Sequence, residues 1–164
     1  MLVSALVSGL MAAPRLRAEP AAGAAMTLSG RTLDGRPFNL GTAQGKVVLA
    51  IFWSTECAVC RDKMPELRLN YEAWRSRRFE LIAVNVDRSE AAFRDYESIL
   101  GRTVAAARRF PSVWRGAPEH TDSFGAITHT PTTFVLDRQH RVVSEVRGRI
   151  PPGLWDDLAE LVLA

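Results

Sequence analysis

The sequence predicts one α/β domain with a mixed central sheet flanked by helices. Two near-continuous apolar runs, 47–53 and 79–86, are typical of strands that are buried on both faces of a sheet. The residues between these runs repeat apolar side chains at helical spacing, which indicates a strand–helix–strand unit with parallel strands. Residues 132–136 and 141–146 indicate a further pair of strands joined by a short turn. This order favours a mixed sheet with helices on both faces.

An N-terminal β-hairpin and a long helix follow from local signals. Asp34-Gly35 lies between residues 27–33 and 37–40, and this dipeptide is typical of a hairpin turn. The helix expected at 58–77 contains Pro65, which should kink it.

The second half of the chain is less regular. Asp87 and Glu90 resemble a capping box, which opens a helix expected to end at Gly101. Three further elements are expected: a short strand near 112–115, a helical turn at 121–124 and a last helix at 152–163. His120 and His140 fall in expected loops, and we predict that both lie on the surface.

Length and charge limit the classes of protein that are possible. The chain has 164 residues, of which 47% are hydrophobic, enough for one domain with a full core. The formal net charge is +3, and the arginines are scattered among acidic residues rather than gathered in a block. This scattered charge leads us to expect no nucleic-acid partner. We also expect the protein to be a monomer.

Residues 1–25 are predicted to be a signal peptide and linker ahead of a domain at 26–164. Residues 2–13 form an apolar stretch with the length of a signal-peptide core, too short to span a bilayer. Arg15 and Arg17 follow this stretch, whereas an export signal normally carries its basic residues in front. We expect a periplasmic or otherwise exported protein, with a membrane-tethered form if the segment is not cleaved.

Both cysteines lie in Cys57-Ala58-Val59-Cys60, at the junction between strand 47–53 and the following helix. Two thiols separated by two residues can close a disulfide locally, and a helix N-terminus stabilises a thiolate on the first of them. This predicts a redox-cycling dithiol in which Cys57 attacks and Cys60 resolves a mixed disulfide. A static disulfide is the less favoured alternative, because so short a loop adds little stability.

Four features carry a resemblance to a known family. They are the segment Phe52-Trp53-Ser54-Thr55-Glu56-Cys57-Ala58-Val59-Cys60, Pro65 five residues beyond it, the segment Thr130-Pro131-Thr132-Thr133-Phe134, and the N-terminal hairpin, which plain thioredoxins lack. From about Met26 to its end the chain resembles the TlpA/ResA-like family of exported bacterial thiol-disulfide oxidoreductases. The resemblance implies a thioredoxin-like fold, protein-disulfide reductase activity and no cofactor.

The resemblance also implies how substrates bind. Pro131 should be cis and lie against the dithiol, which would expose the Thr130 backbone to an extended substrate segment. Trp53 should form a packing platform beside the dithiol, as part of the same substrate-binding surface. The implied partners are proteins with disulfides, such as apocytochrome c or a copper-site protein, and a membrane thiol reductase as electron donor.

Several positions depart from the family pattern. Glu56 stands where Trp is usual, and a carboxylate beside Cys57 disfavours its thiolate, which would make the protein more reducing unless Glu56 is screened by solvent. Lys63 stands where these proteins often carry Glu; it could stabilise a Cys60 thiolate but, when protonated, cannot act as a base. We expect Glu56 and Lys63 to tune the redox potential. No residue is assigned as the base, because Ile51 replaces the buried Asp of thioredoxins.

Two alternative functions are less favoured by the sequence. A copper-binding chaperone would hold Cu(I) with Cys57, Cys60 and His129, since His129 precedes the Thr-Pro segment. Peroxide reduction is disfavoured, because no Pro-x-x-x-Thr-x-x-Cys pattern leads into Cys57. No resident metal is expected, because no second Cys-x-x-Cys is present to complete a structural zinc site.

Overall fold

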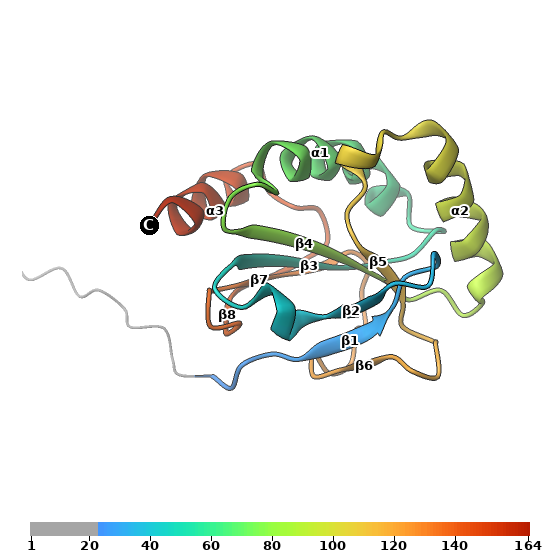
Figure 1. The fold of residues 1–164 in the computed structure, drawn as a ribbon, viewed down its shortest axis with the longest axis horizontal. Coiled ribbons are helices and arrows are strands. Elements are labelled where there is room, and N and C mark those ends of the chain that lie inside the picture. The colour runs from blue at the N-terminus through green and yellow to red at the C-terminus, as the bar shows by residue number, and fades with distance from the viewer. Residues whose placement is uncertain (1–22) are drawn as a thin grey trace, which may run out of the picture.

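A five-stranded mixed sheet forms the centre of the computed structural model, which describes residues 23–164 (Figure 1). Its strand order is β5-β4-β3-β7-β8. The strands are β3 (Val47–Trp53), β4 (Phe79–Asn85), β5 (Ser112–Trp114), β7 (Thr132–Leu136) and β8 (Val142–Arg147). Strands β3, β4 and β5 are parallel, whereas β7 is antiparallel to β3 and to β8. The predicted mixed sheet is therefore confirmed; the predicted signal peptide lies outside the described residues.

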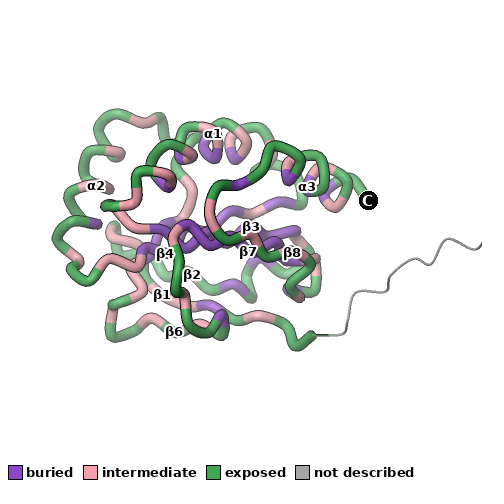
Figure 2. The backbone as a smooth tube through the Cα atoms, turned by 180° about the vertical axis from the view of Figure 1, so that it is seen from behind, coloured by how far each residue is buried: buried purple, intermediate pink, exposed green. Residues whose placement is uncertain are grey.

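The register of the sheet brings together two segments that are distant in the sequence. Strand β3 is buried along its whole length, as its apolar run predicts (Figure 2). Phe52, near its end, pairs with Thr132, the first residue of β7. Because the two strands run in opposite directions, the segment after β3 and the segment before β7 lie side by side at the same end of the sheet.

All three α-helices lie on one face of the sheet (Figures 1 and 2). They are α1 (Ala58–Trp74), α2 (Glu90–Thr103) and α3 (Leu154–Leu163). The expectation of helices on both faces is wrong. The chain moves in one direction from β3 to β4 to β5, and right-handed crossovers then place α1 and α2 on the same side. No helix within residues 23–164 is long and apolar enough to cross a bilayer.

A small second sheet covers the other face. Its order is β2-β1-β6, with β1 (Leu28–Arg31), β2 (Pro37–Asn39) and β6 (Thr121–Asp122), and a short 3-10 helix, η1 (Leu40–Ala43), follows β2. The predicted hairpin is confirmed. The helical turn expected at 121–124 is wrong, since β6 pairs antiparallel with β1. Phe124 then packs on Phe52, with ring centroids 5.1 Å apart, and closes this half of the core.

Three local predictions need correction. Ser89, not Asp87, caps α2, and its hydroxyl accepts the N–H of Ala91 at 3.2 Å. His140 is 3% exposed, because its ring nitrogen lies 3.1 Å from the Ala43 carbonyl oxygen. The His120 side chain is also buried, where it bonds a carboxylate of β6 at 2.8 Å. Both histidines were expected on the surface. A second 3-10 helix, η2 (Ala106–Arg108), follows α2.

Candidate active site

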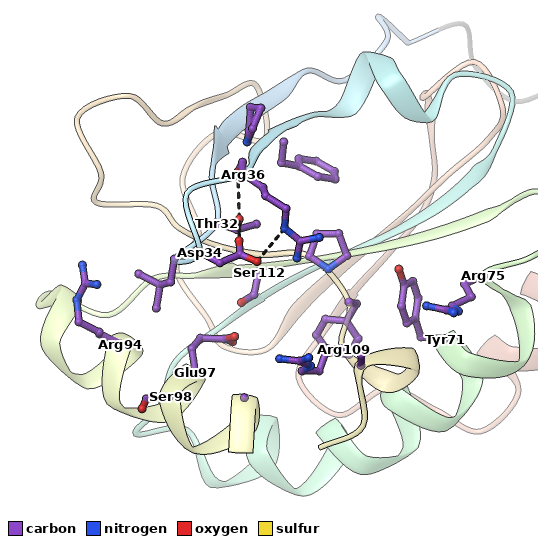
Figure 3. Close-up of a pocket in the computed structure, with 17 residues that line it drawn as sticks. Thr32, Asp34, Arg36, Tyr71, Arg75, Arg94, Glu97, Ser98, Arg109 and Ser112 are labelled. Atoms are coloured by element: carbon purple, nitrogen blue, oxygen red, sulfur yellow. Dashed lines mark hydrogen bonds and ion pairs between the residues drawn. The ribbon is translucent and has the colours of Figure 1, made fainter. Parts of the chain in front are cut away.

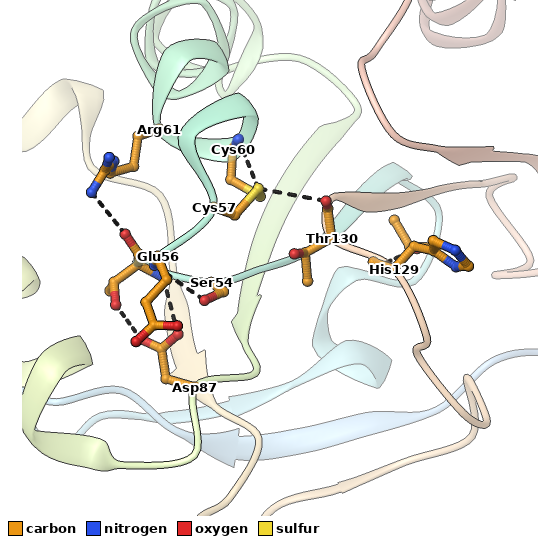
Figure 4. Close-up of a disulfide and its surroundings, with 10 residues drawn as sticks. Ser54, Glu56, Cys57, Cys60, Arg61, Asp87, His129 and Thr130 are labelled. Atoms are coloured by element: carbon orange, nitrogen blue, oxygen red, sulfur yellow. Dashed lines mark hydrogen bonds between the residues drawn. A yellow bond between two sulfur atoms is a disulfide. The ribbon is translucent and has the colours of Figure 1, made fainter.

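The Cys57 and Cys60 side chains form a disulfide where β3 leads into α1 (Figure 4). Their Cα atoms lie 5.2 Å apart, a separation that fits such a bond. Cys57 is partly exposed, whereas Cys60 is fully buried beneath the first turn of the helix. A substrate can therefore reach the sulfur of Cys57 and not that of Cys60.

Cys57 is the N-cap of α1, and its sulfur accepts the backbone N–H of Cys60 at 3.1 Å. Its carbonyl oxygen accepts the N–H of Arg61 at 3.1 Å, which starts the helical hydrogen bonds. In the reduced protein the same amide and the positive end of the helix dipole would stabilise a thiolate at this position. This geometry favours Cys57 as the nucleophile.

The Thr130–Pro131 peptide bond is cis, and the Thr130 carbonyl oxygen lies 3.5 Å from the Cys57 sulfur (Figure 4). Two hydrogen bonds hold this loop. The hydroxyl of Thr132 donates to the His129 carbonyl at 2.8 Å, and the N–H of Gly148 donates to the Pro131 carbonyl at 2.7 Å. Within residues 23–164 the Thr130 N–H has no hydrogen-bond acceptor. A backbone donor is therefore available beside the reactive sulfur.

Asp87 supports the turn that carries Cys57, a role that the sequence analysis missed. Its carboxylate accepts the N–H of Thr55 at 3.0 Å, the Thr55 hydroxyl at 2.7 Å and the side-chain amide of Asn85 at 3.0 Å. Burial acts to raise the pKa of Asp87, but hydrogen bonds from Ser54, Thr55 and Asn85 outweigh it and hold the pKa below its usual value. Its place just past β4, the strand parallel to β3, was the available sequence signal.

The comparisons with known proteins agree with this site. A sequence model described as the AhpC/TSA family matches residues 21–145. The chain belongs to this family.

Among the relatives of this AhpC/TSA-family protein is the thiol-disulfide oxidoreductase ResA of Bacillus subtilis, 27% identical over 129 residues. The match covers 79% of the chain and 68% of that protein. ResA of Bacillus thuringiensis subsp. konkukian is 27% identical over 116 residues, and there the match spans 63% of the relative's length. The structure resembles a thiol:disulfide interchange protein from Chlorobium tepidum, with a TM-score of 0.71 and 25% identity over 90% of this chain and all of the other. Family, fold and disulfide together identify a thioredoxin-like thiol-disulfide oxidoreductase, as the TlpA/ResA-like resemblance implies.

Trp53 does not form a substrate platform in this family member. It is 1% exposed and packs on Tyr96 and Phe93 of α2, with ring centroids 4.8 and 6.4 Å away. Because side chains alternate along a strand, Trp53 faces the helical layer, where it lies in the same core cluster as Cys60 and beneath the surface that a substrate would meet. The predicted substrate contact is therefore wrong, and the side chain belongs to the core.

The two predicted redox-tuning residues occupy different settings. Glu56 is exposed, and its side chain points away from the disulfide (Figure 4). Lys63 is mostly buried and pairs with Glu66 at 2.7 Å; Glu66 also accepts the indole N–H of Trp155. Burial acts to raise the pKa of Glu66, but the hydrogen bonds from Lys63 and Trp155 and the charge of Lys63 outweigh burial, and the net pKa is lowered. The carboxylate is therefore ionised and balances the charge of Lys63.

His129 does not approach the dithiol. It is exposed, its ring bonds the Thr128 hydroxyl at 2.9 Å, and Figure 4 shows the ring directed away from the two sulfurs. In the part of the chain that the structure describes, no group of three His, Cys, Asp or Glu residues could hold a metal ion. The copper-site alternative thus gains no support from this arrangement.

Proposed function

We propose that this protein is an exported reductase of protein disulfides. The observation that carries the proposal is the Cys60 N–H on the Cys57 sulfur, which prepares an exposed nucleophile over a buried resolving thiol. The relatives whose names describe thiol-disulfide oxidoreductases support the same chemistry.

The reaction follows from this asymmetry. The reduced Cys57 thiolate attacks one sulfur of a substrate disulfide, the substrate S–S bond breaks, and the second substrate sulfur leaves as a thiolate that takes a proton. Cys60, deprotonated, then attacks the Cys57 sulfur, which restores the Cys57–Cys60 disulfide and releases the first substrate sulfur as a thiol. The substrate gains two electrons from the protein and two protons, one from the Cys60 thiol and one from the solvent, because Cys57 starts as a thiolate.

The loop before β7 is proposed to hold the substrate. The free Thr130 N–H and the Thr130 carbonyl lie beside Cys57 and can pair with an extended substrate strand across the sulfur. Pro131 shapes this loop. Two electrons must return to the disulfide after each cycle, and we propose a membrane thiol reductase as their donor.

Location and partners rest on the sequence pattern. We propose that residues 1–25 export the domain at 26–164 to the periplasm, or tether it to the membrane if they are retained. Disulfide-containing proteins such as apocytochrome c or copper-site proteins are the proposed substrates, and the working form is a monomer without nucleic acid.

A turnover assay with insulin as the disulfide substrate tests the proposal. In the presence of dithiothreitol, the protein should accelerate insulin reduction, and Cys57→Ser should return the rate to that of dithiothreitol alone. Glu119→Gln, a change on the exposed loop ahead of β6, is the matched control and should leave the rate intact. A wild-type rate equal to the dithiothreitol background would show a static disulfide and reject the proposal.

A further inference from the structure

A cavity of about 990 Å³ opens between the hairpin, α1, α2 and the segment before β5 (Figure 3). Its walls come from residues 32–38, from Tyr71 on α1 and Arg75 just after this helix, from one face of α2 and from 106–112. None of these residues belongs to the dithiol site. The volume lies within the range of sites that bind small molecules.

Basic side chains dominate the rim of this cavity. Four arginines line it, against two acidic residues: Arg36, Arg75, Arg94 and Arg109, with Asp34 and Glu97. Arg36 is neutralised by Asp34 at 2.8 Å, and Arg94 by Glu90 of its own helix. Arg75 and Arg109 make no ion pair with any residue between 23 and 164. In the cavity Arg109 lies near Glu97, where its charge opposes the larger effect of burial on the pKa of that carboxyl group, and both guanidinium groups can still pair with an anion.

The interior of the cavity also holds a buried polar group. Ser112 is 6% exposed; its hydroxyl makes no hydrogen bond of good geometry among the described residues, but it lies close enough to the Glu97 carboxylate to oppose the rise that burial causes in the pKa of that group. Figure 3 shows it in the wall between Asp34 and Glu97. A buried hydroxyl without a partner costs free energy, and a ligand oxygen would remove that cost.

An apolar floor accompanies these polar groups. The rings of Tyr71 and Phe110 pack edge to face, with centroids 5.9 Å apart, and both line the cavity. Burial raises the pKa of Tyr71 to about 12, so its phenol adds no negative charge at neutral pH. Phe38 and Leu33 extend the apolar surface. The chemistry suits a molecule with an apolar body and an anionic end.

We propose that this cavity binds a small organic anion whose phosphate or carboxylate group pairs with Arg109 and whose apolar body packs on Phe110. Arg75 supplies a second cation, and the Ser112 hydroxyl a hydrogen bond. Glu97 opposes the anion, because an ionised carboxylate in the same cavity repels it; burial raises the pKa of Glu97 and weakens this opposition.

Amide NMR titration of the oxidised full chain tests the site. Phenyl phosphate and benzoate are the probes; inorganic phosphate and phenol separate the anionic from the apolar contribution. We expect saturable shifts at the amides of residues 97, 109, 110 and 112 with phenyl phosphate or benzoate, and Kd values about tenfold higher for inorganic phosphate and phenol. The tighter of the two organic probes identifies the anionic group.

Three variants distinguish a built site from general attraction to a basic surface. Arg109→Gln should raise the Kd about tenfold. Glu97→Gln should lower the Kd several-fold, a gain that an unfolded variant cannot mimic. Arg108→Gln removes the same charge next door, where Arg108 pairs with Glu72 outside the cavity, and should leave the Kd within about twofold. Equal weakening by both arginine variants, no gain in Glu97→Gln, or no saturable binding would each overturn the proposal.

Discussion

The backbone N–H of Cys60 donates to the sulfur of Cys57 across 3.1 Å. The two cysteines therefore play unequal parts before any substrate arrives. Cys57 caps α1 and is accessible, whereas the Cys60 side chain is packed in the core among the residues of α1 and β3. Negative charge on Cys57 is stabilised by this amide and by the helix dipole, and both effects end within the first turn. We therefore expect a mixed disulfide with substrate to form at Cys57, and the buried Cys60 thiol to resolve it.

Asp87→Asn should loosen the turn between β3 and α1. An amide in place of the carboxylate can accept from Thr55 only with its single oxygen, so one bond to the N–H or hydroxyl of Thr55 is lost. We expect the free energy of unfolding to fall by about 1–3 kcal/mol and insulin reduction to slow. Urea denaturation and the turnover assay measure these effects. A variant with wild-type stability and rate would show that Asp87 does not position the turn.

Lys63 and Glu66 should act on the redox potential as a balanced pair. Lys63 lies one turn beyond Cys60, on the same side of α1. Glu66→Gln should raise the potential by about 10–30 mV, because the unbalanced Lys63 charge stabilises the reduced, thiolate form. Lys63→Gln should lower it by a similar amount, and the double variant should return close to wild type. Glutathione redox titration gives the values; a double variant as low as Lys63→Gln alone would contradict the balance.

Trp53→Phe should affect folding more than substrate use. Trp53 fills the core between β3 and α2, so the smaller ring should cost about 1–3 kcal/mol of unfolding free energy. Its KM for insulin should stay unchanged, since the indole does not reach the surface. A raised KM with unchanged stability would restore the substrate role that the structure removes.

Acid should destabilise the protein partly through Asp122. Burial acts to raise the pKa of Asp122, but His120, Arg115 and the N–H of Phe124 outweigh it and lower the pKa to about 2 from 3.8. A carboxyl group with a lowered folded-state pKa contributes stability above its unfolded pKa and loses it as the pH falls toward the folded value. Stability should therefore drop between about pH 4 and pH 2. Urea midpoints should fall less steeply there in Asp122→Asn; an identical slope would contradict the assignment.

Much of the fold could be predicted because its signals are local. The buried strands β3 and β4 follow from continuous apolar runs, and the hairpin from Asp34-Gly35. The placement of all three α-helices on one face does not follow from local patterns, because it depends on β5 lying beyond β4, and strand order is not a local property. Strand β6 has only two residues and is defined by its pairing with β1, so it is too short for an alternating pattern of apolar residues to predict it.

The features of the site also divide into those with a local sequence signal and those that depend on contacts between distant residues. The two cysteines lie three positions apart at a strand–helix junction, and this local signal predicts the disulfide between Cys57 and Cys60. The spacing of Asp87 and Glu90 predicts a capping box, whereas the Asp87 carboxylate binds Thr55, which lies 32 residues earlier. The burial of His140 depends on a backbone oxygen 97 residues away, which no local pattern contains.

Trapping of the mixed disulfide tests the central claim most directly. The reduced Cys60→Ser variant is mixed with insulin, quenched with acid and analysed by non-reducing mass spectrometry and peptide mapping. We expect a stable adduct in which an insulin chain is attached to Cys57, and no adduct in Cys57→Ser, whose remaining thiol is buried. An adduct on Cys60 in Cys57→Ser at an equal rate, or no adduct in either variant, would show that Cys57 is not the attacking thiol.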